Sequence, residues 1–400
     1  MSRDHLRSSS CAKPQDPPLA GIDPEQRKPL LPQATYHGPM TAFADRAPYA
    51  RLTPHQMLDA LAAAGFPITG GLIQLNSYEN RVVQASLEDG TAVVAKFYRP
   101  RRWSDDQILE EHAFARELEA DDLPIAAPIV LSSPHANASL GLAGDPPTLG
   151  HWQPDVDPDD DDRTPSPVYR FGVAPRRAGR APELENPHTL AWLGRLLGRL
   201  HTVGARRPFA YRRALDCDTY GTQAVARVEQ SELLTRGQSA TWLSVANHAV
   251  DAARQAFAAA GPLRNIRLHG DCHPGNILWR EEGDFAGPLF VDLDDACMGP
   301  AVQDLWMLLS GDREAMQGQL SHVLNGYRAF MDFNPAELAL IEPLRALRMI
   351  HHSAWIADRW DDPAFPAAFP WFGTPAYWDQ QTTQLREQLE HMTLDPLRAF

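Results

Sequence analysis

Apolar residues recur at helical spacing where the patterned part of the chain begins. Thr53 can cap a helix, Pro54 suits its first position, and Gly65 is a typical residue just beyond a helix end. Between them the apolar positions fall three or four residues apart, at Met57, Leu58, Leu61 and Ala62. This stripe predicts an amphipathic helix.

The pattern then changes to the alternation of β-strands, in the runs 71–75, 80–87 and 92–98. A hairpin turn at 88–90 connects the last two. In the third run Lys96 lies on the face opposite Val93, Ala95 and Phe97. A helix is predicted to follow over 105–119.

From about Tyr169 the chain is mainly helical. One apolar stripe consists of Leu190, Leu193, Leu196, Leu197 and Leu200, and a second helix is predicted over 239–260. Short β-like runs occur at 266–269, 277–279 and 289–293. Strands therefore lead and helices follow, which predicts an α+β fold of two lobes, a small antiparallel-sheet N-lobe and a mainly helical C-lobe.

These patterns divide the chain into three predicted parts. Residues 1–45 are rich in proline, serine and charge and are predicted to form a disordered tail. Residues 46–170 form the N-lobe, and 171–400 the helical C-lobe. Within the N-lobe, 135–167 contains six aspartates within eight positions and is predicted to be a solvated insertion.

Charge and cysteine usage restrict the class of protein. The net charge of −14 argues against nucleic-acid binding through a broad basic surface. No apolar run reaches the roughly 18 residues that a membrane helix needs. The cysteines Cys11, Cys217, Cys272 and Cys297 show no disulfide framework, so a cytoplasmic protein is expected.

The strongest chemical signal is the segment HGDCHPGN at 269–276. It has the pattern HxDxxxxN of a kinase catalytic loop, and Asp292 ends an apolar run sixteen residues after Asn276. Phosphoryl transfer needs a carboxylate beside the attacking hydroxyl, which is the predicted catalytic role of Asp271. The amide oxygen of Asn276 and the carboxylate of Asp292 are hard ligands suited to Mg²⁺. The combination predicts a protein-kinase-like fold that uses ATP.

Lys96 has the position of the strand lysine that binds ATP phosphates in kinases. Such a lysine needs a carboxylate partner on the next helix, where Glu110 and Glu111 both lie in range. Glu111 shares its helical face with the apolar residues Phe114, Ala115 and Leu118, so it is the favoured partner.

Other residues are predicted to support this site. No glycine-rich loop precedes the lysine strand, but Ser77, in the turn LNSYENR, can bind a phosphate oxygen. Asp304 is predicted to anchor the catalytic loop through the loop's backbone. Asp294 and Asp295 lie either behind the metal ligands or in solvent.

The segments HGDCHPGNILW, FVDLDDACMGPAVQDLWMLL, LNSYENRV and VVAKFYRPRRW resemble the bacterial stress response kinase A family, within the aminoglycoside phosphotransferase and choline kinase group. The resemblance covers about residues 50–395. It implies a monomeric, cytoplasmic serine/threonine protein kinase that phosphorylates itself and moderates stress responses. It also implies that Asp271 accepts the proton, that Asn276 and Asp292 bind magnesium, that Asp292 is catalytic as well, and that Ser77 contacts ATP.

Two alternatives stay open at the level of sequence. A small-molecule kinase for an amino-alcohol, a sugar or an aminoglycoside would use the same catalytic loop, because Asp271 serves any hydroxyl. A catalytically inactive scaffold is the other alternative, but it conflicts with the complete set of Lys96, Glu111, Asp271, Asn276 and Asp292.

Overall fold

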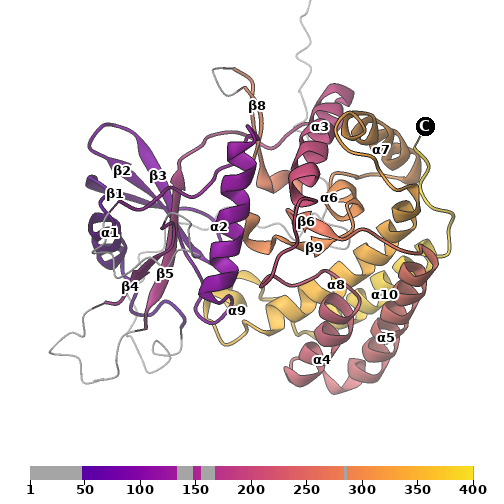
Figure 1. The fold of residues 1–400 in the computed structure, drawn as a ribbon. Coiled ribbons are helices and arrows are strands. Elements are labelled where there is room, and N and C mark those ends of the chain that lie inside the picture. Colours follow the sequence, from indigo (N-terminus) through magenta and orange to yellow (C-terminus); the bar gives the residue numbers. More distant parts are fainter. Residues whose placement is uncertain (1–46, 133–146, 155–166, 283–285, 400) are drawn as a thin grey trace, which may run out of the picture.

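The structure, a computed structural model, describes residues 47–132, 147–154, 167–282 and 286–399. Figure 1 shows a sheet-containing N-lobe beside a larger helical C-lobe, which confirms the predicted two-lobed, protein-kinase-like fold. The predicted tail at 1–45 lies outside the described residues, as does most of 135–167. Within the described ranges, no helix is long and apolar enough to cross a membrane.

The N-lobe is built on one antiparallel sheet with the strand order β1-β2-β3-β5-β4. Its elements are α1 (Pro54–Ala63), β1 (Ile68–Gln74), β2 (Arg81–Leu87), β3 (Ala92–Phe97), α2 (Asp105–Ala120), β4 (Gly150–Trp152) and β5 (Tyr169–Pro175). The first helix, the three strands and the helix after them agree with the predictions from residue periodicity.

The two faces of this sheet have different neighbours. Met57, Ala60 and Leu61 of α1 form one buried cluster with the β3 residues that alternate with Lys96. The other face is turned toward α2 and the C-lobe (Figure 1). Because side chains alternate along a strand, Lys96 points from β3 toward the space between the lobes.

Two segments differ from the predictions. Residues 169–175 form β5, a strand beside β3, and not the start of the helical part, so the N-lobe extends to Pro175 and the lobe junction follows it. The alternate burial of Tyr169, Phe171 and Val173 is the strand signal that the prediction overlooked.

Residues 147–154, inside the predicted solvated insertion, include the edge strand β4. Leu149 is fully buried, and Gly150 lies so close to the Phe171 ring that a side chain there would collide with it. This short apolar stretch is therefore part of the folded N-lobe, although acidic residues follow it in the sequence.

The C-lobe surrounds one large apolar core. Its helices are α3 (Pro187–Gly204), α4 (Gln223–Gln230), α5 (Arg236–Ala259), α6 (Val302–Trp306), α7 (Arg313–Tyr327), α8 (Ile341–Ala357), α9 (Ala364–Ala368) and α10 (Pro375–His391). The predicted leucine stripe of α3 is buried in this core. Phe365, Phe372 and Trp378 are buried there too, so much of the aromatic C-terminal third packs the last helices.

Two short strand pairs carry the candidate site at the N-lobe side of this core. They are β6 (Ile266–Leu268) with β9 (Cys297–Gly299), and β7 (Ile277–Arg280) with β8 (Gly287–Phe290). The last strand ends at Phe290, earlier than the predicted 293. Asp292 follows the strand and takes a left-handed backbone with φ 62°.

Candidate active site

The catalytic-loop segment leaves β6 at Leu268 and enters β7 at Ile277. Gly270 has φ 84°, and a side chain there would collide with the backbone carbonyl of Asp295, so only glycine fits this turn. The turn brings Asp271 to the open side of the loop, where its side chain is 22% exposed.

Asp304 anchors the underside of the loop, as predicted. Its fully buried carboxylate accepts hydrogen bonds from the backbone N–H groups of His269 (2.8 Å) and Gly270 (2.9 Å), and it lies 3.0 Å from Nε2 of His201. Burial alone would raise the pKa of Asp304, but the hydrogen bond and charge of His201 hold it below its usual value. The loop is therefore fixed by an ionised carboxylate whose oxygens are engaged.

On the upper side of the loop, Asp271 has an exchangeable partner. Its Oδ1 lies 2.7 Å from a guanidinium nitrogen of Arg348, which projects from α8. The other oxygen lies 3.5 Å from Nε2 of His273. Arg348 is about one third exposed, and its contact with Oδ1 lacks the geometry of a hydrogen bond, so an incoming substrate can replace it.

Asn276 and Asp292 lie together because β7 and β8 are paired. The backbone N–H of Val291 donates to the carbonyl of Asn276 over 3.0 Å, which extends the ladder to the residue before Asp292. The Asn276 amide nitrogen donates to the backbone carbonyl of Asp271 over 3.0 Å. This contact leaves the amide oxygen of Asn276 available for another partner.

These two residues fit the expected magnesium. An amide oxygen and a carboxylate are the donors that Mg²⁺ prefers, and Mg²⁺ completes its shell with phosphate and water oxygens. Among the described residues, no group of three or more His, Cys, Asp or Glu side chains could hold a metal alone. The donor set therefore suits a metal that arrives with a phosphate-bearing substrate.

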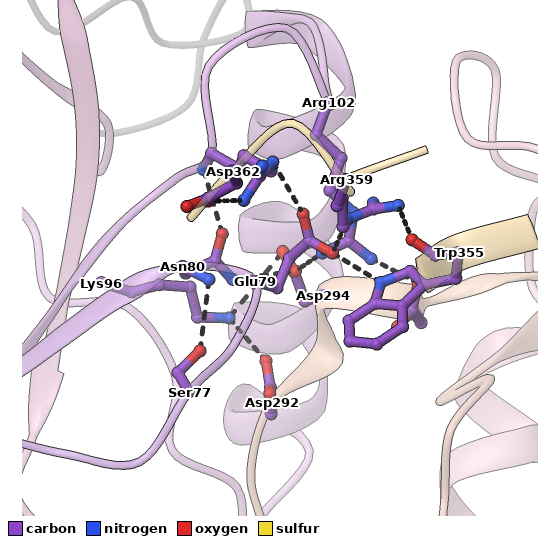
Figure 2. A network of polar contacts seen from close by, with 12 residues as sticks. Ser77, Glu79, Asn80, Lys96, Arg102, Asp292, Asp294, Trp355, Arg359 and Asp362 are labelled. Atoms are coloured by element: carbon purple, nitrogen blue, oxygen red, sulfur yellow. Dashed lines mark hydrogen bonds and ion pairs between the residues drawn. The ribbon is translucent and has the colours of Figure 1, made fainter. Parts of the chain in front are cut away.

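Lys96 reaches this site from the N-lobe. Its Nζ lies 2.7 Å from Oδ1 of Asp292 and 4.0 Å from Oδ1 of Asp294 (Figure 2). Burial alone would lower the pKa of Lys96, but the two carboxylates hold it well above its usual value. The strand lysine and the predicted metal carboxylate are thus brought together across 196 residues of sequence.

The expected ion pair between Lys96 and Glu111 is not formed, because Lys96 binds Asp292. Glu111 is nevertheless buried on α2 near Lys96, and its Oε2 accepts a hydrogen bond from the Tyr98 hydroxyl at 3.4 Å. Burial raises the pKa of Glu111, and the positive charge of Lys96 opposes that rise.

Glu110, the less favoured candidate, has a different role. Its carboxylate accepts hydrogen bonds from the backbone N–H groups of Tyr211 (2.8 Å) and Arg212 (2.9 Å) in the C-lobe. Its position on α2 therefore connects that helix to the loop at 210–212. Of the two glutamates, only Glu111 is buried beside Lys96.

Side-chain hydrogen bonds hold the predicted phosphate-binding turn in place. The Ser77 hydroxyl accepts from the backbone N–H of Asn80 at 3.2 Å. Asn80 is buried, and its amide donates to Asp294 (3.0 Å) while its oxygen accepts from the backbone N–H of Arg99 (3.0 Å). The turn thus has a fixed shape without the glycines of a typical kinase loop.

Sequence reasoning overlooked a network of ion pairs between the lobes, shown in Figure 2. Asp294 is buried and pairs with Arg102, which excludes the alternative that it lies in solvent. Glu79, in the Ser77 turn, lies 2.6 Å from both the Trp355 indole nitrogen and Nε of Arg359. The charged residues in the segments LNSYENR and DLDDA were the only sequence signal that could have indicated this network.

Comparisons with known proteins agree with this geometry. Residues 71–341 match the phosphotransferase enzyme family. Stress response kinase A of Salmonella choleraesuis is 40% identical over 88% of this chain and 96% of its own length. The relative from Salmonella typhimurium, called serine/threonine protein kinase RdoA, and stress response kinase A of Escherichia coli K12 show the same identity and coverage.

Solved structures with low sequence identity share the fold. An amicoumacin kinase in complex with AMP-PNP, Ca²⁺ and Ami covers 87% of this chain and 96% of its own with TM-score 0.59, at 19% identity. A microcompartment-associated aminopropanol kinase covers 85% and 99%, with TM-score 0.58 and 18% identity. The chain therefore belongs to the phosphotransferase enzyme family and, within it, to the stress response kinase A family of kinases.

Proposed function

We propose that this kinase is an ATP- and Mg²⁺-dependent serine/threonine protein kinase that phosphorylates itself and protein partners. The observation that carries the proposal is the convergence of Asp271, Asn276, Asp292 and Lys96 on one open face between the lobes. The names of relatives at 40% identity support protein hydroxyls as acceptors, and they support a place in the bacterial stress response. A cytoplasmic location is part of the same proposal.

In the proposed mechanism, each side chain has one task. The phosphates of ATP replace Asp292 as the partner of Lys96, and the freed carboxylate joins Asn276 as a metal ligand. Mg²⁺, when bound there, neutralises charge that develops on the transferred phosphoryl group. Asp271 orients the serine or threonine hydroxyl and accepts its proton, and Ser77 contacts phosphate from above.

The proposed function is tested with γ-labelled ATP and Mg²⁺. Label on serine or threonine of the kinase itself, and of added protein substrates, is the expected result. ATP consumption only in the presence of a small hydroxyl compound, with no label on protein, would contradict it and favour the small-molecule alternative. Binding of ATP without turnover would favour the scaffold alternative.

A further inference from the structure

A cavity of about 500 Å³ lies between the lobes, lined by more cationic than anionic side chains. One wall consists of the N-lobe segment after β3, and the other of α4, the end of α8 and the residues that follow it. Six arginines line it, together with three aspartates. The arginines are Arg99, Arg101, Arg102, Arg213, Arg227 and Arg359.

Three of these arginines are fixed in ion pairs, one of them Arg359, which lies 2.6 Å from Glu79. Others have donors to spare. Arg99 binds Asp362 at 2.9 Å, and Arg102 binds Asp294 and Asp295, in nearly buried ion pairs. Arg213 reaches Asp295 only at 3.4 Å, on the same oxygen that Arg102 uses, and its Nε is buried without a hydrogen-bond acceptor among the described residues. Unpaired guanidinium N–H groups beside a cavity indicate a ligand with anionic oxygens.

On the C-lobe wall, Arg227 is also incompletely paired. Arg227 on α4 has Asp358 as a partner at 3.1 Å, but without the alignment that a hydrogen bond needs. Burial lowers the pKa of Arg227, and Asp358 offsets this only in part. The pKa of His351 is held well below its usual value by burial and then by surrounding arginines, including Arg213 and Arg227. A bound anion would stabilise these cations.

Helix α8 connects the cavity to the catalytic carboxylate. Arg348, whose guanidinium touches Asp271, stands one helical turn before His351 and two before Trp355, and both of these line the cavity. The cavity therefore begins about one helical turn along α8 from the arginine that contacts Asp271. A group that occupies it can belong to the acceptor substrate.

We propose that this cavity binds carboxylates of an acidic peptide segment whose serine or threonine is the acceptor. The inference rests on the proposed protein-kinase function and names its substrate class. The acidic residues next to the hydroxyl turn Arg213 and Arg227 toward them, while Arg348 leaves Asp271 as the hydroxyl arrives. A cationic aminoglycoside or amino-alcohol would meet like charge at the same place.

The test uses the full chain and three peptides that share a central serine flanked by Asp, by Asn or by Lys. We expect kcat/KM to be at least about tenfold higher for the Asp peptide than for the Asn peptide, and lowest for the Lys peptide. Arg227→Gln should bring the Asp and Asn peptides to within about twofold of each other, mainly through KM. Arg386→Gln, at an exposed arginine on α10 outside the cavity, should leave the preference unchanged.

Each contrary outcome has its own meaning. Equal use of the three peptides by the wild-type protein would overturn the inference and leave the proposed function intact. Phosphorylation of a small hydroxyl compound with no peptide labelled would overturn the proposed function. If Arg227→Gln does not fold, the inference is still tested with the wild-type protein. Its preference for the Asp peptide should be lost at high salt, because salt screens ion pairs with an exposed peptide.

Discussion

The two sides of the catalytic loop are built in opposite ways. Underneath, Asp304 is fully buried and holds two backbone N–H groups and His201. Above, Asp271 and Asp292 are partly exposed, and each is bound to a single cationic side chain, Arg348 or Lys96. The underside fixes the backbone, whereas the upper side holds carboxylates in contacts that a substrate can replace.

This difference indicates where function and stability are located. A buried carboxylate with engaged oxygens contributes to folding, because its removal leaves N–H groups without partners. A partly exposed carboxylate that contacts one cationic side chain contributes less to stability, so it is available for chemistry. Substitutions on the two sides should therefore have separable effects on turnover and on unfolding.

The largest effect is expected for Asp292→Asn. Asparagine tolerates the left-handed backbone at this position, so the fold should be kept while the anionic metal ligand is lost. We expect Mg²⁺-dependent turnover to fall by about 10³-fold, or about 4 kcal/mol in barrier, with less than about 1 kcal/mol change in stability. Steady-state kinetics and urea unfolding check this, with Asp379→Asn on α10 as the control. Turnover within about tenfold of wild type would contradict the role of Asp292.

Asp304→Asn should have the reverse effect. The amide nitrogen of the new asparagine would face a buried backbone N–H of His269 or Gly270. The negative charge beside His201 would also be lost. We expect a loss of about 3 kcal/mol in the free energy of unfolding. Urea denaturation measures it. A stability equal to that of the wild type would show that the underside is not the fixed part of the loop.

Glu110→Gln should have a smaller effect on stability. The backbone N–H groups of Tyr211 and Arg212 would lose their charged acceptor, the Glu110 carboxylate. We expect the free energy of unfolding to fall by about 2 kcal/mol. ATP affinity, measured by calorimetry, should stay within about threefold, because Lys96 is not in contact with Glu110. Glu111→Gln, in contrast, should weaken ATP binding more than it lowers stability. The same ATP affinity loss for both variants would contradict the choice of Glu111.

The effect that is smallest at neutral pH comes from the buried histidine His112. His112 contacts Tyr98 and Thr148, and burial, followed by Lys96 and Arg212, lowers its pKa to about 3 from 6.5. Below pH 6.5 the unfolded chain binds a proton there that the folded chain does not. Stability from this group is therefore complete above pH 6.5 and falls as the pH drops toward about 3, by at most about 1.4 kcal/mol per pH unit.

Replacement by a residue that does not titrate tests this pH dependence. His112→Gln should flatten the pH profile of the unfolding free energy between pH 6.5 and pH 4. His188→Gln, at an exposed histidine on α3, should leave the slope as it is in the wild type. An unchanged slope in His112→Gln would show that His112 is not the group responsible.

Sequence patterns predicted those site residues whose type and spacing are required by the chemistry of phosphoryl transfer. The catalytic loop, Asp292, Lys96 and the Asp304 anchor follow from spacing and from the chemistry of phosphoryl transfer, and the structure brings them together. The strand β5 was overlooked because its central glycine and terminal proline weaken a short alternating pattern.

Contacts between the lobes could not be predicted in the same way. Glu79 pairs with Arg359 and Trp355 across more than 270 residues, and Arg348 meets Asp271 only through the placement of α8. Nothing local in the sequence distinguishes these residues from charged residues in solvent. The partner of Lys96 depends on which carboxylate lies nearest to it in the folded protein, and helical periodicity carries no information about that distance.

The most direct test of the account compares turnover and thermal unfolding of Asp271→Asn with those of the wild-type protein. With γ-labelled ATP and Mg²⁺, we expect phosphoryl transfer to fall by roughly 10²-fold or more while the unfolding midpoint stays within about 2 °C, because Asp271 sits on the replaceable side of the loop. Near-normal transfer by the variant would contradict the assignment of Asp271 as the residue that orients and deprotonates the acceptor.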